Sequence, residues 1–298
     1  MKEVSATASV SLDTGGRIED VPKHHPTVEE HYSDGRLLDE IRAGIRAIGK
    51  TPQSVTVDEL APVDEFHIGG RQASEDFIGQ LGLSPSDHVL DVGCGFGGTS
   101  RFVASRYGCR VTGIDLTPEF IEAGRALCSW VGLSGRIELH HGSALAMPFE
   151  ASAFEAAFML HVGMNIPDKS GLFSEVRRVL KTGAVFGIYD VMRKSSQQLV
   201  YPVPWATSAE TSELASVEEY EDGLRRSGFE VINVRDRRQC AAEFFEAARK
   251  QAEAAGDSPP LGVHVAMGQD APLKIRNMME NIAADRVSPI EVIARRTG

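Results

Sequence analysis

The sequence lacks any apolar run long enough to cross a membrane, and no apolar signal segment follows its start. A bilayer-spanning helix needs ~20 mostly apolar residues, far more than the longest runs here provide. Basic residues are also in deficit, because 31 Lys and Arg stand against 42 Asp and Glu, a formal charge of -11. Nucleic-acid-binding proteins usually carry a basic surplus to meet the phosphates. We therefore expect a cytoplasmic protein that neither inserts into a membrane nor binds nucleic acid.

Cysteine is scarce as well. The four cysteines, at positions 94, 109, 128 and 240, form no C-x-x-C pair and show no spacing with histidine that suits zinc. His140 and His141 lie next to each other on an expected strand, so their side chains should face opposite sides. These patterns predict reduced thiols and no metal site. With 42% apolar and 24% charged residues, the composition is that of an ordinary globular protein.

A glycine-rich segment lies between a strand-like run and a helix-like run. It reads Asp91-Val92-Gly93-Cys94-Gly95-Phe96-Gly97-Gly98, and the next strand-like run ends in Asp115. Glycines let the backbone turn sharply there, so a ligand can approach the main chain and the helix N-terminus. Gly93, Gly95 and Gly98 also satisfy G-x-G-x-x-G, the dinucleotide fingerprint, with Asp115 placed for the ribose hydroxyls. The glycines alone leave more than one cofactor open.

Asp91 separates these cofactors. Its carboxylate lies two residues before the first glycine, at the end of the apolar run from His88 to Val92. At close range it would repel a pyrophosphate, whereas it would attract a cofactor with a cationic amino-acid end. S-adenosylmethionine (SAM) has such an ammonium, together with a sulfonium, a ribose diol and no phosphate. The pattern therefore favours SAM, with a dinucleotide-dependent dehydrogenase as the remaining enzyme alternative.

Four ordered motifs resemble the class I SAM-dependent methyltransferases. They are Asp91 to Gly97, Gly113-Ile114-Asp115, the adenine-type segment Gly142 to Phe149, and Phe154 to His161 with Arg178 to Gly183. The resemblance implies an α/β fold with a Rossmann-like seven-stranded methyltransferase sheet. It also implies an enzyme that uses SAM, releases S-adenosylhomocysteine (SAH) and methylates a small molecule.

Periodicity and composition divide the chain around this core. They predict a disordered leader over 1–22, an N-terminal helical lid segment over 23–84 and a SAM-binding methyltransferase domain over 85–298. Within that domain we expect a substrate loop at 191–215 and a helical insertion at 238–285, before the last strand. The insertion should form a flap or an oligomer contact, such as that of a homodimer. The expected strands cover 88–92, 110–114, 136–140, 154–160, 184–190, 229–235 and 290–294.

The resemblance assigns cofactor contacts residue by residue. Asp115 would hold the ribose hydroxyls, with Leu116 against adenine, while Asp91 and the turn at Gly93, Gly95 and Gly97 would hold the methionine end. Ser143 and Ala144 stand in the adenine segment, where the family usually has an aspartate in place of Ser143. Gly69 and Gly70 open an expected helix and could offer amides to the methionine carboxylate. Asp115 could instead cap the helix that begins at Pro118.

The expected catalytic residues surround the position of the transferable methyl group. His161 follows the fourth strand and would either accept a proton from the nucleophile or touch the cofactor only through its backbone. His67 and Tyr32 precede the core and could fold over the pocket. Asn165, Tyr201, Trp205 and Arg71 are the expected substrate-binding residues, with Arg71, Arg193 or Arg276 available for a carboxylate.

The leader and the tail narrow the resemblance. Tyr32 to Gly35, Asp64 to Arg71, His161 to Ile166 and Tyr201 to Trp205 look like the sarcosine/dimethylglycine N-methyltransferase-like family. This resemblance implies transfer to an amine nitrogen. C- or O-methylation of a natural product remains the alternative, for which aromatic faces or a histidine base would serve. A module that binds SAM without turnover is a third hypothesis.

Overall fold

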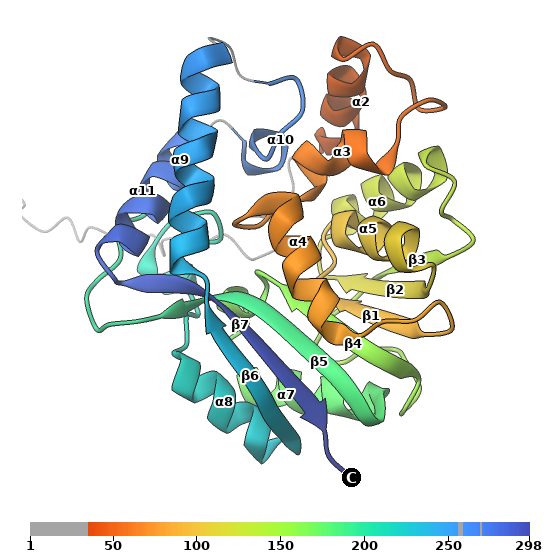
Figure 1. Cartoon of the computed structure of the whole chain (residues 1–298), viewed down its shortest axis with the longest axis vertical. Helices are drawn as coiled ribbons and strands as arrows, with labels where there is room; N and C mark the ends of the chain where they lie inside the picture. Colours follow the sequence, from red (N-terminus) through yellow and green to blue (C-terminus); the bar gives the residue numbers. More distant parts are fainter. Residues whose placement is uncertain (1–34, 256–258, 269) are drawn as a thin grey trace, which may run out of the picture.

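The computed structural model describes residues 35–255, 259–268 and 270–298, and the predicted leader and Tyr32 lie outside these ranges. A seven-stranded sheet in the order β3-β2-β1-β4-β5-β7-β6 forms its centre (Figure 1). The strands are β1 (His88–Val92), β2 (Arg110–Asp115), β3 (Ile137–His141), β4 (Phe154–Leu160), β5 (Leu180–Arg193), β6 (Phe229–Asp236) and β7 (Val287–Arg296).

Helices cover both faces of the sheet. The helices of the alternating core are α5 (Gly98–Tyr107), α6 (Pro118–Trp130), α7 (Lys169–Val179) and α8 (Val217–Arg226). Leu172 and Phe173 of α7 and Tyr220 of α8 pack on one face, whereas Phe102 of α5 and Ile121 of α6 pack on the other. Because both faces are buried, β1 and β4 read as nearly continuous apolar runs.

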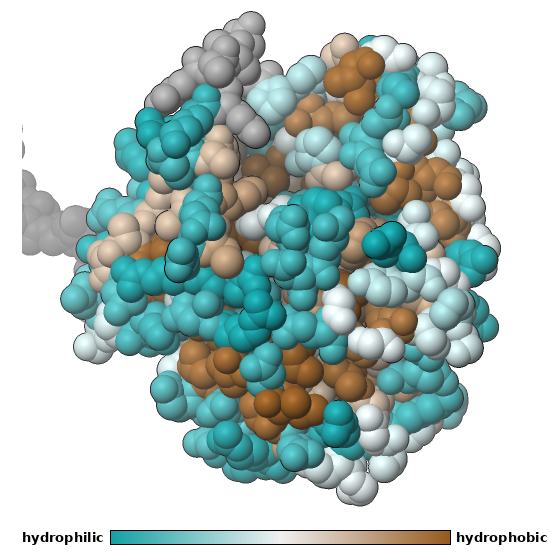
Figure 2. Space-filling model, viewed as in Figure 1, coloured by the Kyte–Doolittle hydropathy of each residue, from teal (hydrophilic) through white to brown (hydrophobic). Residues whose placement is uncertain are grey.

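Parallel pairing ends at β5. Strands β1 to β5 pair in parallel, but β7 runs antiparallel between β5 and β6. Strand β5 is longer than the predicted 184–190, because it pairs with β7 as far as Arg193↔Val287. Ile232 and Val234 of edge strand β6 are exposed, and Figure 2 shows hydrophobic residues gathered on the lower part of the viewed face.

The segment before β1 is helical, as the periodicity predicted. It contains α2 (Leu37–Ala47), α3 (Val57–Asp64), α4 (Gly70–Ile78) and the 3-10 turn η1 (Gly79–Leu81). A capping box of Thr56 and Glu59 begins α3. Helix α4 packs its apolar side on the sheet through Phe77 and Ile78. The other two helices lie beyond the sheet, at the top of Figure 1.

The insertion between β6 and β7 is helical too. It contains α9 (Arg238–Ala255), α10 (His264–Met267) and α11 (Ala271–Ala283). Leu261 and Val265 of this insertion pack in the same apolar cluster as Ile41 and Ile45 of α2. The contact is close, because a Cβ added to Gly44 of α2 would meet Leu261 Cδ2 at 2.5 Å. The insertion therefore contacts the N-terminal helices directly.

The remaining predicted elements are found within a few residues of their expected limits. Ser216 and Glu219 form a capping box at the start of α8, and Pro118 opens α6. The segment after β5 carries only the short turn η3 (Ala209–Thr211), while η2 (Gly163–Asn165) follows β4. Within the residues that the structure describes, no helix combines the length and the apolar character that a bilayer crossing requires.

Candidate functional site

The glycine turn joins β1 to α5 and lies against the ends of two other elements. Gly93 has φ 71°, and a Cβ there would overlap Val162 Cγ2, so a side chain would displace the segment after β4. A Cβ on Gly98 would overlap the carbonyl oxygen of Asp64. The glycines therefore let the turn approach both the end of β4 and the end of α3.

Asp115 ends β2 and holds the glycine turn. Its Oδ2 accepts a hydrogen bond from the Gly95 amide at 2.9 Å, and its Oδ1 accepts one from the Thr117 amide at 2.9 Å. Burial raises the pKa of Asp115, and the two amide bonds oppose that shift. Both roles expected for Asp115 are compatible with this geometry, because it braces the turn before α6 and also lines the cavity described below.

Asp91 is the penultimate residue of β1 and is 3% exposed. Its Oδ2 accepts a hydrogen bond from Ser100 Oγ at 2.6 Å. Burial raises the pKa of Asp91 to about 7, and the nearby Asp115 charge adds to the shift. A carboxylate in such surroundings is stabilised by a cation brought within a few ångströms.

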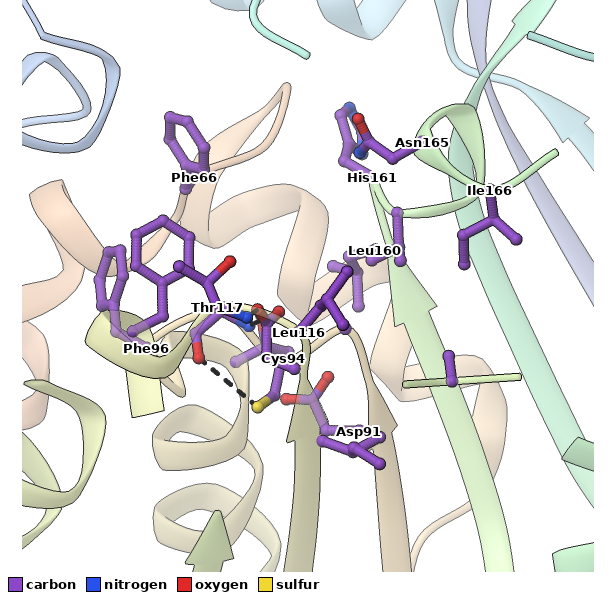
Figure 3. Close-up of a pocket in the computed structure, with 18 of the residues that line it drawn as sticks. Phe66, Asp91, Cys94, Phe96, Leu116, Thr117, Leu160, His161, Asn165 and Ile166 are labelled. Carbon is purple, nitrogen blue, oxygen red and sulfur yellow. Dashed lines mark hydrogen bonds between the residues drawn. The ribbon is translucent and has the colours of Figure 1, made fainter. Parts of the chain in front are cut away.

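A cavity of about 360 Å³ opens beside these carboxylates. Its wall includes three of the expected catalytic or substrate-binding residues, His67, His161 and Asn165. It also includes these expected cofactor-binding residues: Asp91, Gly93, Gly95, Asp115, Leu116 and the pair Ser143–Ala144. Figure 3 shows Asp91 near the strand ends, with Phe66 and His161 farther out on opposite sides. The structure thus gathers most of the expected residues around one space.

Two apolar side chains mark one part of the wall. Leu116 is 42% exposed and Leu145 is 39% exposed, although most large apolar side chains of the core are buried. Ser143 turns its Oγ to accept a hydrogen bond from the Leu145 amide at 3.2 Å. A flat heteroaromatic ring would cover Leu116 and Leu145 and remove their apolar surface from water.

His161 occupies a left-handed backbone conformation, with φ 55°. Its amide donates to the Tyr189 carbonyl at 2.7 Å, and its Nδ1 lies 3.2 Å from the same oxygen. Its Nε2 accepts a hydrogen bond from the Ile68 amide at 3.4 Å. Burial, followed by the neighbouring His67, lowers the pKa of His161 to about 3. The ring therefore joins β5 to the N-terminal segment in its neutral form.

Several expected site residues lie elsewhere. Gly69 caps α4 with φ 93°, and Gly69, Gly70 and Gly97 are not part of the cavity wall. Arg71 lies with its Nε 2.9 Å from Glu65 Oε1 and its guanidinium 4.5 Å from the centre of the Phe102 ring. Its charge is already paired, so the structure does not bring Arg71 to the cavity.

Tyr201 and Trp205 are also absent from the cavity wall. Trp205 is 3% exposed, and its Nε1 donates to Ser212 Oγ at 2.9 Å. Both side chains pack in the apolar cluster that includes Met278 and Ile282 of α11. The segment 191–215 therefore uses its aromatic residues to pack against the insertion, because the insertion offers an apolar face there.

Asp64, Phe96 and Phe120 are among the wall residues that were given no site role from the sequence, whereas Phe66 is one of the aromatic residues considered for a C-methylated substrate. Phe96 and Phe120 meet edge to face with ring centroids 5.6 Å apart. Phe96 lies inside the glycine motif and Phe66 directly precedes His67. Their closeness in sequence to expected site residues was therefore the signal that could have placed them in the cavity wall. Asp64 forms a buried ion pair with Arg101, including a bond from Nε to Oδ2 of 3.1 Å.

The sheet order, with an antiparallel last strand between β5 and β6, is that of the Rossmann-like methyltransferase fold. Residues 89–183 match the family model described as a methyltransferase domain. The matched residues extend from β1 through α7 into the start of β5. They cover less than half of the chain.

Curated relatives differ in their reactions. The chain is 34% identical over 110 residues to a sterol 24-C-methyltransferase of Gibberella zeae, across 37% of this chain and 29% of the relative. It is 26% identical over 220 residues to an O-methyltransferase of Aspergillus sclerotiorum, across 70% of this chain and 79% of the relative. The chain thus spans less than a third of the length of the sterol methyltransferase.

Solved structures share the fold at low identity. A geranyl diphosphate C-methyltransferase of Streptomyces coelicolor, solved with Mg2+, geranyl diphosphate and SAH, has a TM-score of 0.61 at 21% identity, over 76% of this chain and 79% of that one. A putative sarcosine dimethylglycine methyltransferase of Galdieria sulphuraria has a TM-score of 0.62 at 19% identity, over 76% of this chain and 86% of that one. The [4+2]-cyclase SpnF has a TM-score of 0.64 at 19% identity, over 92% of this chain and 98% of that one. The fold therefore does not identify the reaction.

Proposed function

We propose that this chain is a SAM-dependent methyltransferase that acts on a small molecule. The observation that carries the proposal is the pair Asp91 and Asp115, which lie at the carboxyl-terminal ends of the neighbouring parallel strands β1 and β2 and line the same cavity as the glycine turn. Ligands of open α/β sheets bind at the carboxyl ends of the strands, where this pair lies. The match of residues 89–183 to a methyltransferase domain supports the same conclusion.

The chemistry of this wall fits SAM from one end to the other. Asp91 is a buried carboxylate whose pKa is raised to about 7, so an ammonium group beside it would favour its charged form. Asp115 lies one strand away and can meet the ribose hydroxyls. The exposed Leu116 and Leu145 fit the adenine ring. The geranyl diphosphate enzyme was solved in complex with SAH, which supports the same cofactor here.

The reaction would depend mainly on placement. SAM supplies a methyl group on a positively charged sulfur, which the nucleophile displaces in line. Correct placement of two reactants contributes ~7 to 11 kcal/mol to such a step. The chain would hold the cofactor with its strand ends and the acceptor beside His67, His161 and Asn165, which line the same cavity. Tyr32 stays a proposed catalytic residue outside the described ranges.

The first substrate hypothesis is an amine nitrogen of the sarcosine or dimethylglycine type. The likeness to the Galdieria protein supports it. A substrate carboxylate would need a cation, yet the described part of the cavity wall contains no lysine or arginine. Phe66, Phe96 and Phe120 supply aromatic faces instead. This wall supports the alternative of C- or O-methylation better than it supports a zwitterionic amine.

Calorimetric titration with SAH and with NADH tests the cofactor. We expect SAH to bind and NADH not to bind, because a pyrophosphate would lie beside Asp91. NADH binding without SAH binding would overturn the proposal.

Mass spectrometry of the protein with SAM and a panel of acceptors tests the activity. The panel contains sarcosine, dimethylglycine, phosphoethanolamine, prenyl diphosphates and phenols, and the readout is a gain of one methyl. Gain on an amine supports the first hypothesis, and gain on carbon or oxygen supports the alternative. Binding of SAH with no gain on any member favours a module that binds SAM without turnover.

A further inference from the structure

Three polar side chains lie together where α3 leads into α4. Glu65 is 5% exposed, Ser74 of α4 is fully buried, and the ring of His67 is 4% exposed. His67 belongs to the cavity wall, whereas Glu65 and Ser74 lie behind it. No role described above uses Glu65 or Ser74, although a buried carboxylate is costly unless its partners stabilise it.

The hydrogen bonds in this group have a defined direction. Ser74 Oγ donates to Glu65 Oε2 at 2.6 Å, and Arg71 Nε lies 2.9 Å from Glu65 Oε1. Burial raises the pKa of Glu65, and the Arg71 charge opposes that shift in favour of the carboxylate. A serine hydroxyl has one proton to donate, and here it is donated to the carboxylate in a hydrogen bond. Ser74 Oγ can therefore only accept from His67 Nε2, which lies 3.1 Å away.

We propose that Glu65 and Ser74 are positioning residues that hold the proton of His67 on Nε2, so that Nδ1 keeps a lone pair for the substrate proton. This inference rests on the proposed function, because it assigns the proton acceptor of the same site. The arrangement follows the general logic of a catalytic base oriented by a carboxylate. Here the serine hydroxyl stands between the carboxylate and the imidazole.

The other histidine of the wall is less suited to this task. His161 donates from Nδ1 toward the Tyr189 carbonyl, and its Nε2 lone pair already accepts from the Ile68 amide. Accepting a substrate proton on Nε2 would break the contact with Ile68. His67 lies close by, with its ring centroid 6.0 Å from that of His161. Of the two histidines, His67 is therefore the proton acceptor and His161 the structural partner.

The proposed step balances in charge and atoms. The nucleophile of the substrate forms a bond to the methyl carbon, and the electron pair of the carbon–sulfur bond stays on sulfur, which loses its positive charge. The proton of the nucleophile moves to Nδ1 of His67. The positive charge thus ends on the imidazolium, whose Nε2 lies 3.5 Å from Glu65 Oε2.

Several groups surround the His67 ring. Glu65 and Arg71 are the charged neighbours, while His161 and Tyr189 approach from β4 and β5, the latter with ring centroids 6.1 Å apart. The pKa of His67 is lowered to about 4, mainly by burial; a backbone hydrogen bond with Gly70 opposes the shift, and the Arg71 charge contributes to it. The ring is therefore neutral at pH 7 and able to accept a proton.

Nitrogen NMR of the histidine rings tests the proposal without any substrate. The full chain with 15N-labelled histidine is saturated with SAH at pH 7.5, and His67→Gln identifies the His67 signals. We expect the wild-type ring to carry its proton on Nε2. Ser74→Ala should move part of the population to Nδ1–H, and Ser74→Thr, which keeps the hydroxyl, should restore the wild-type spectrum.

The same spectra, recorded against pH, test Glu65. Glu65→Gln should lower the pKa of His67, because the carboxylate no longer stabilises the imidazolium. Glu75→Gln is the control, since Glu75 is exposed on α4, the helix that carries Ser74, and its replacement should leave the pKa of His67 unchanged. A wild-type ring with its proton on Nδ1 overturns the proposal, whatever the variants do. So does a tautomer that Ser74→Ala leaves unchanged in a folded protein.

Turnover gives an independent readout on the first acceptor that gains a methyl. General bases contribute ~100- to 10,000-fold, so Ser74→Ala and Glu65→Gln, which only weaken one, should lower kcat by ~10- to 100-fold. The KM for SAM should stay unchanged. A kcat within twofold of wild type would overturn the inference. Absence of any methylated acceptor would count against the proposed function alone, because the tautomer is measured separately.

Discussion

Asp91 and Asp115 lie at the carboxyl-terminal ends of neighbouring strands, yet the chain holds them differently. Both oxygens of Asp115 accept backbone amides, whereas Asp91 receives one serine hydroxyl at Oδ2. The position of Asp115 is thus fixed by backbone hydrogen bonds before any ligand binds. The raised pKa of Asp91 would fall when a ligand cation binds beside it. The two carboxylates therefore predict different responses to pH and to substitution.

Affinity for SAH should depend on pH through Asp91. The ammonium of SAH interacts with the charged carboxylate, and the pKa of Asp91 in the free protein is about 7. We expect the Kd to fall by ~10-fold between pH 6 and pH 8, since one pH unit below a pKa leaves a tenth of the group charged. Calorimetry at both values measures this. An affinity that is equal at both would contradict the role of Asp91.

Asp91→Asn should stabilise the free protein while it weakens binding. A carboxyl whose pKa is raised binds a proton more tightly when folded than unfolded. The free energy of unfolding therefore falls as pH rises from the ordinary aspartate range to about 7, and the loss is complete above that. At pH 8 the variant should melt at a higher temperature than wild type. Asp222→Asn, an exposed control, should leave both the melting temperature and the Kd unchanged.

Asp115→Ala should weaken SAH binding by ~10- to 150-fold, the equivalent of a charge-assisted hydrogen bond of ~1.5 to 3 kcal/mol. The physical reason is double, because the variant loses the ribose contact and also frees the Gly95 and Thr117 amides. Asp115→Asn keeps an acceptor oxygen and should lose less affinity. Calorimetric affinities that match wild type in both variants would refute the ribose assignment.

Residues inside dense motifs were predictable from the sequence, and residues that depend on distant partners were not. Asp91, Asp115 and Leu116 follow strand ends, so the sheet itself places them in the cavity wall. Arg71 was expected there because arginine suits a carboxylate. It instead pairs with Glu65 and covers Phe102, a ring 31 positions away in sequence that no local pattern indicates.

At the scale of elements, the turn η2 after β4 is held by two distant elements. Asp190 of β5 is fully buried and accepts a hydrogen bond from Tyr220 of α8 at 2.6 Å. Gly163 of η2 packs against both groups, so that an added Cβ would overlap Tyr220 Oη and Asp190 Oδ2. These contacts fix the turn that carries Asn165 into the cavity wall.

Gly163→Ala should therefore destabilise the protein by ~1 to 3 kcal/mol, the usual effect of overpacking. It should also disturb the outer wall of the cavity, where Asn165 lies. Gly135→Ala is the control, because a Cβ there meets nothing within 4 Å. Urea unfolding of the two variants measures the difference. Equal free energies of unfolding for the two variants would show that η2 accommodates the added methyl group and would contradict this prediction.

For the insertion between β6 and β7, the sequence indicated the helices but not what they pack against. Its helices were predictable from periodicity, but their partners were not. Asn277 of α11 donates to the Pro202 carbonyl at 2.9 Å, and Asn281 exchanges hydrogen bonds of 2.9 Å with the backbone of Val200. Two asparagines one turn apart thus replace the missing backbone partners of the segment 191–215. The aromatic residues of that segment, which was predicted as a substrate loop, pack on the insertion.

At the scale of the whole molecule, one buried ion pair joins the N-terminal helices to the glycine turn. Arg101 and Asp64 are both fully buried as side chains, and Arg101 also donates from Nη1 to the Phe96 carbonyl at 2.7 Å. Burial raises the pKa of Asp64, and the Arg101 charge opposes the shift. The pair therefore stabilises the contact between α3 and α5 only while both charges are present.

Arg101→Met should destabilise the protein by ~3 to 5 kcal/mol, because it leaves Asp64 charged and buried without its partner. The double variant Arg101→Met with Asp64→Leu should regain much of that loss, since an apolar pair of similar volume can replace an ion pair. Chemical unfolding of the single and double variants gives the coupling energy. Simple additivity of the two single effects would contradict this account.

Strand β7 has a consequence for synthesis of the chain. It is last in sequence, yet it lies between β5 and β6 and pairs with both. While residues 287–296 are still inside the ribosome, the nascent β6 has no neighbour, and the apolar edge of β5 stays open to other chains. Chaperone binding to stalled nascent chains should therefore persist until this strand emerges. The cavity wall, whose residues all lie between Asp64 and Pro167 in sequence, is by then already translated.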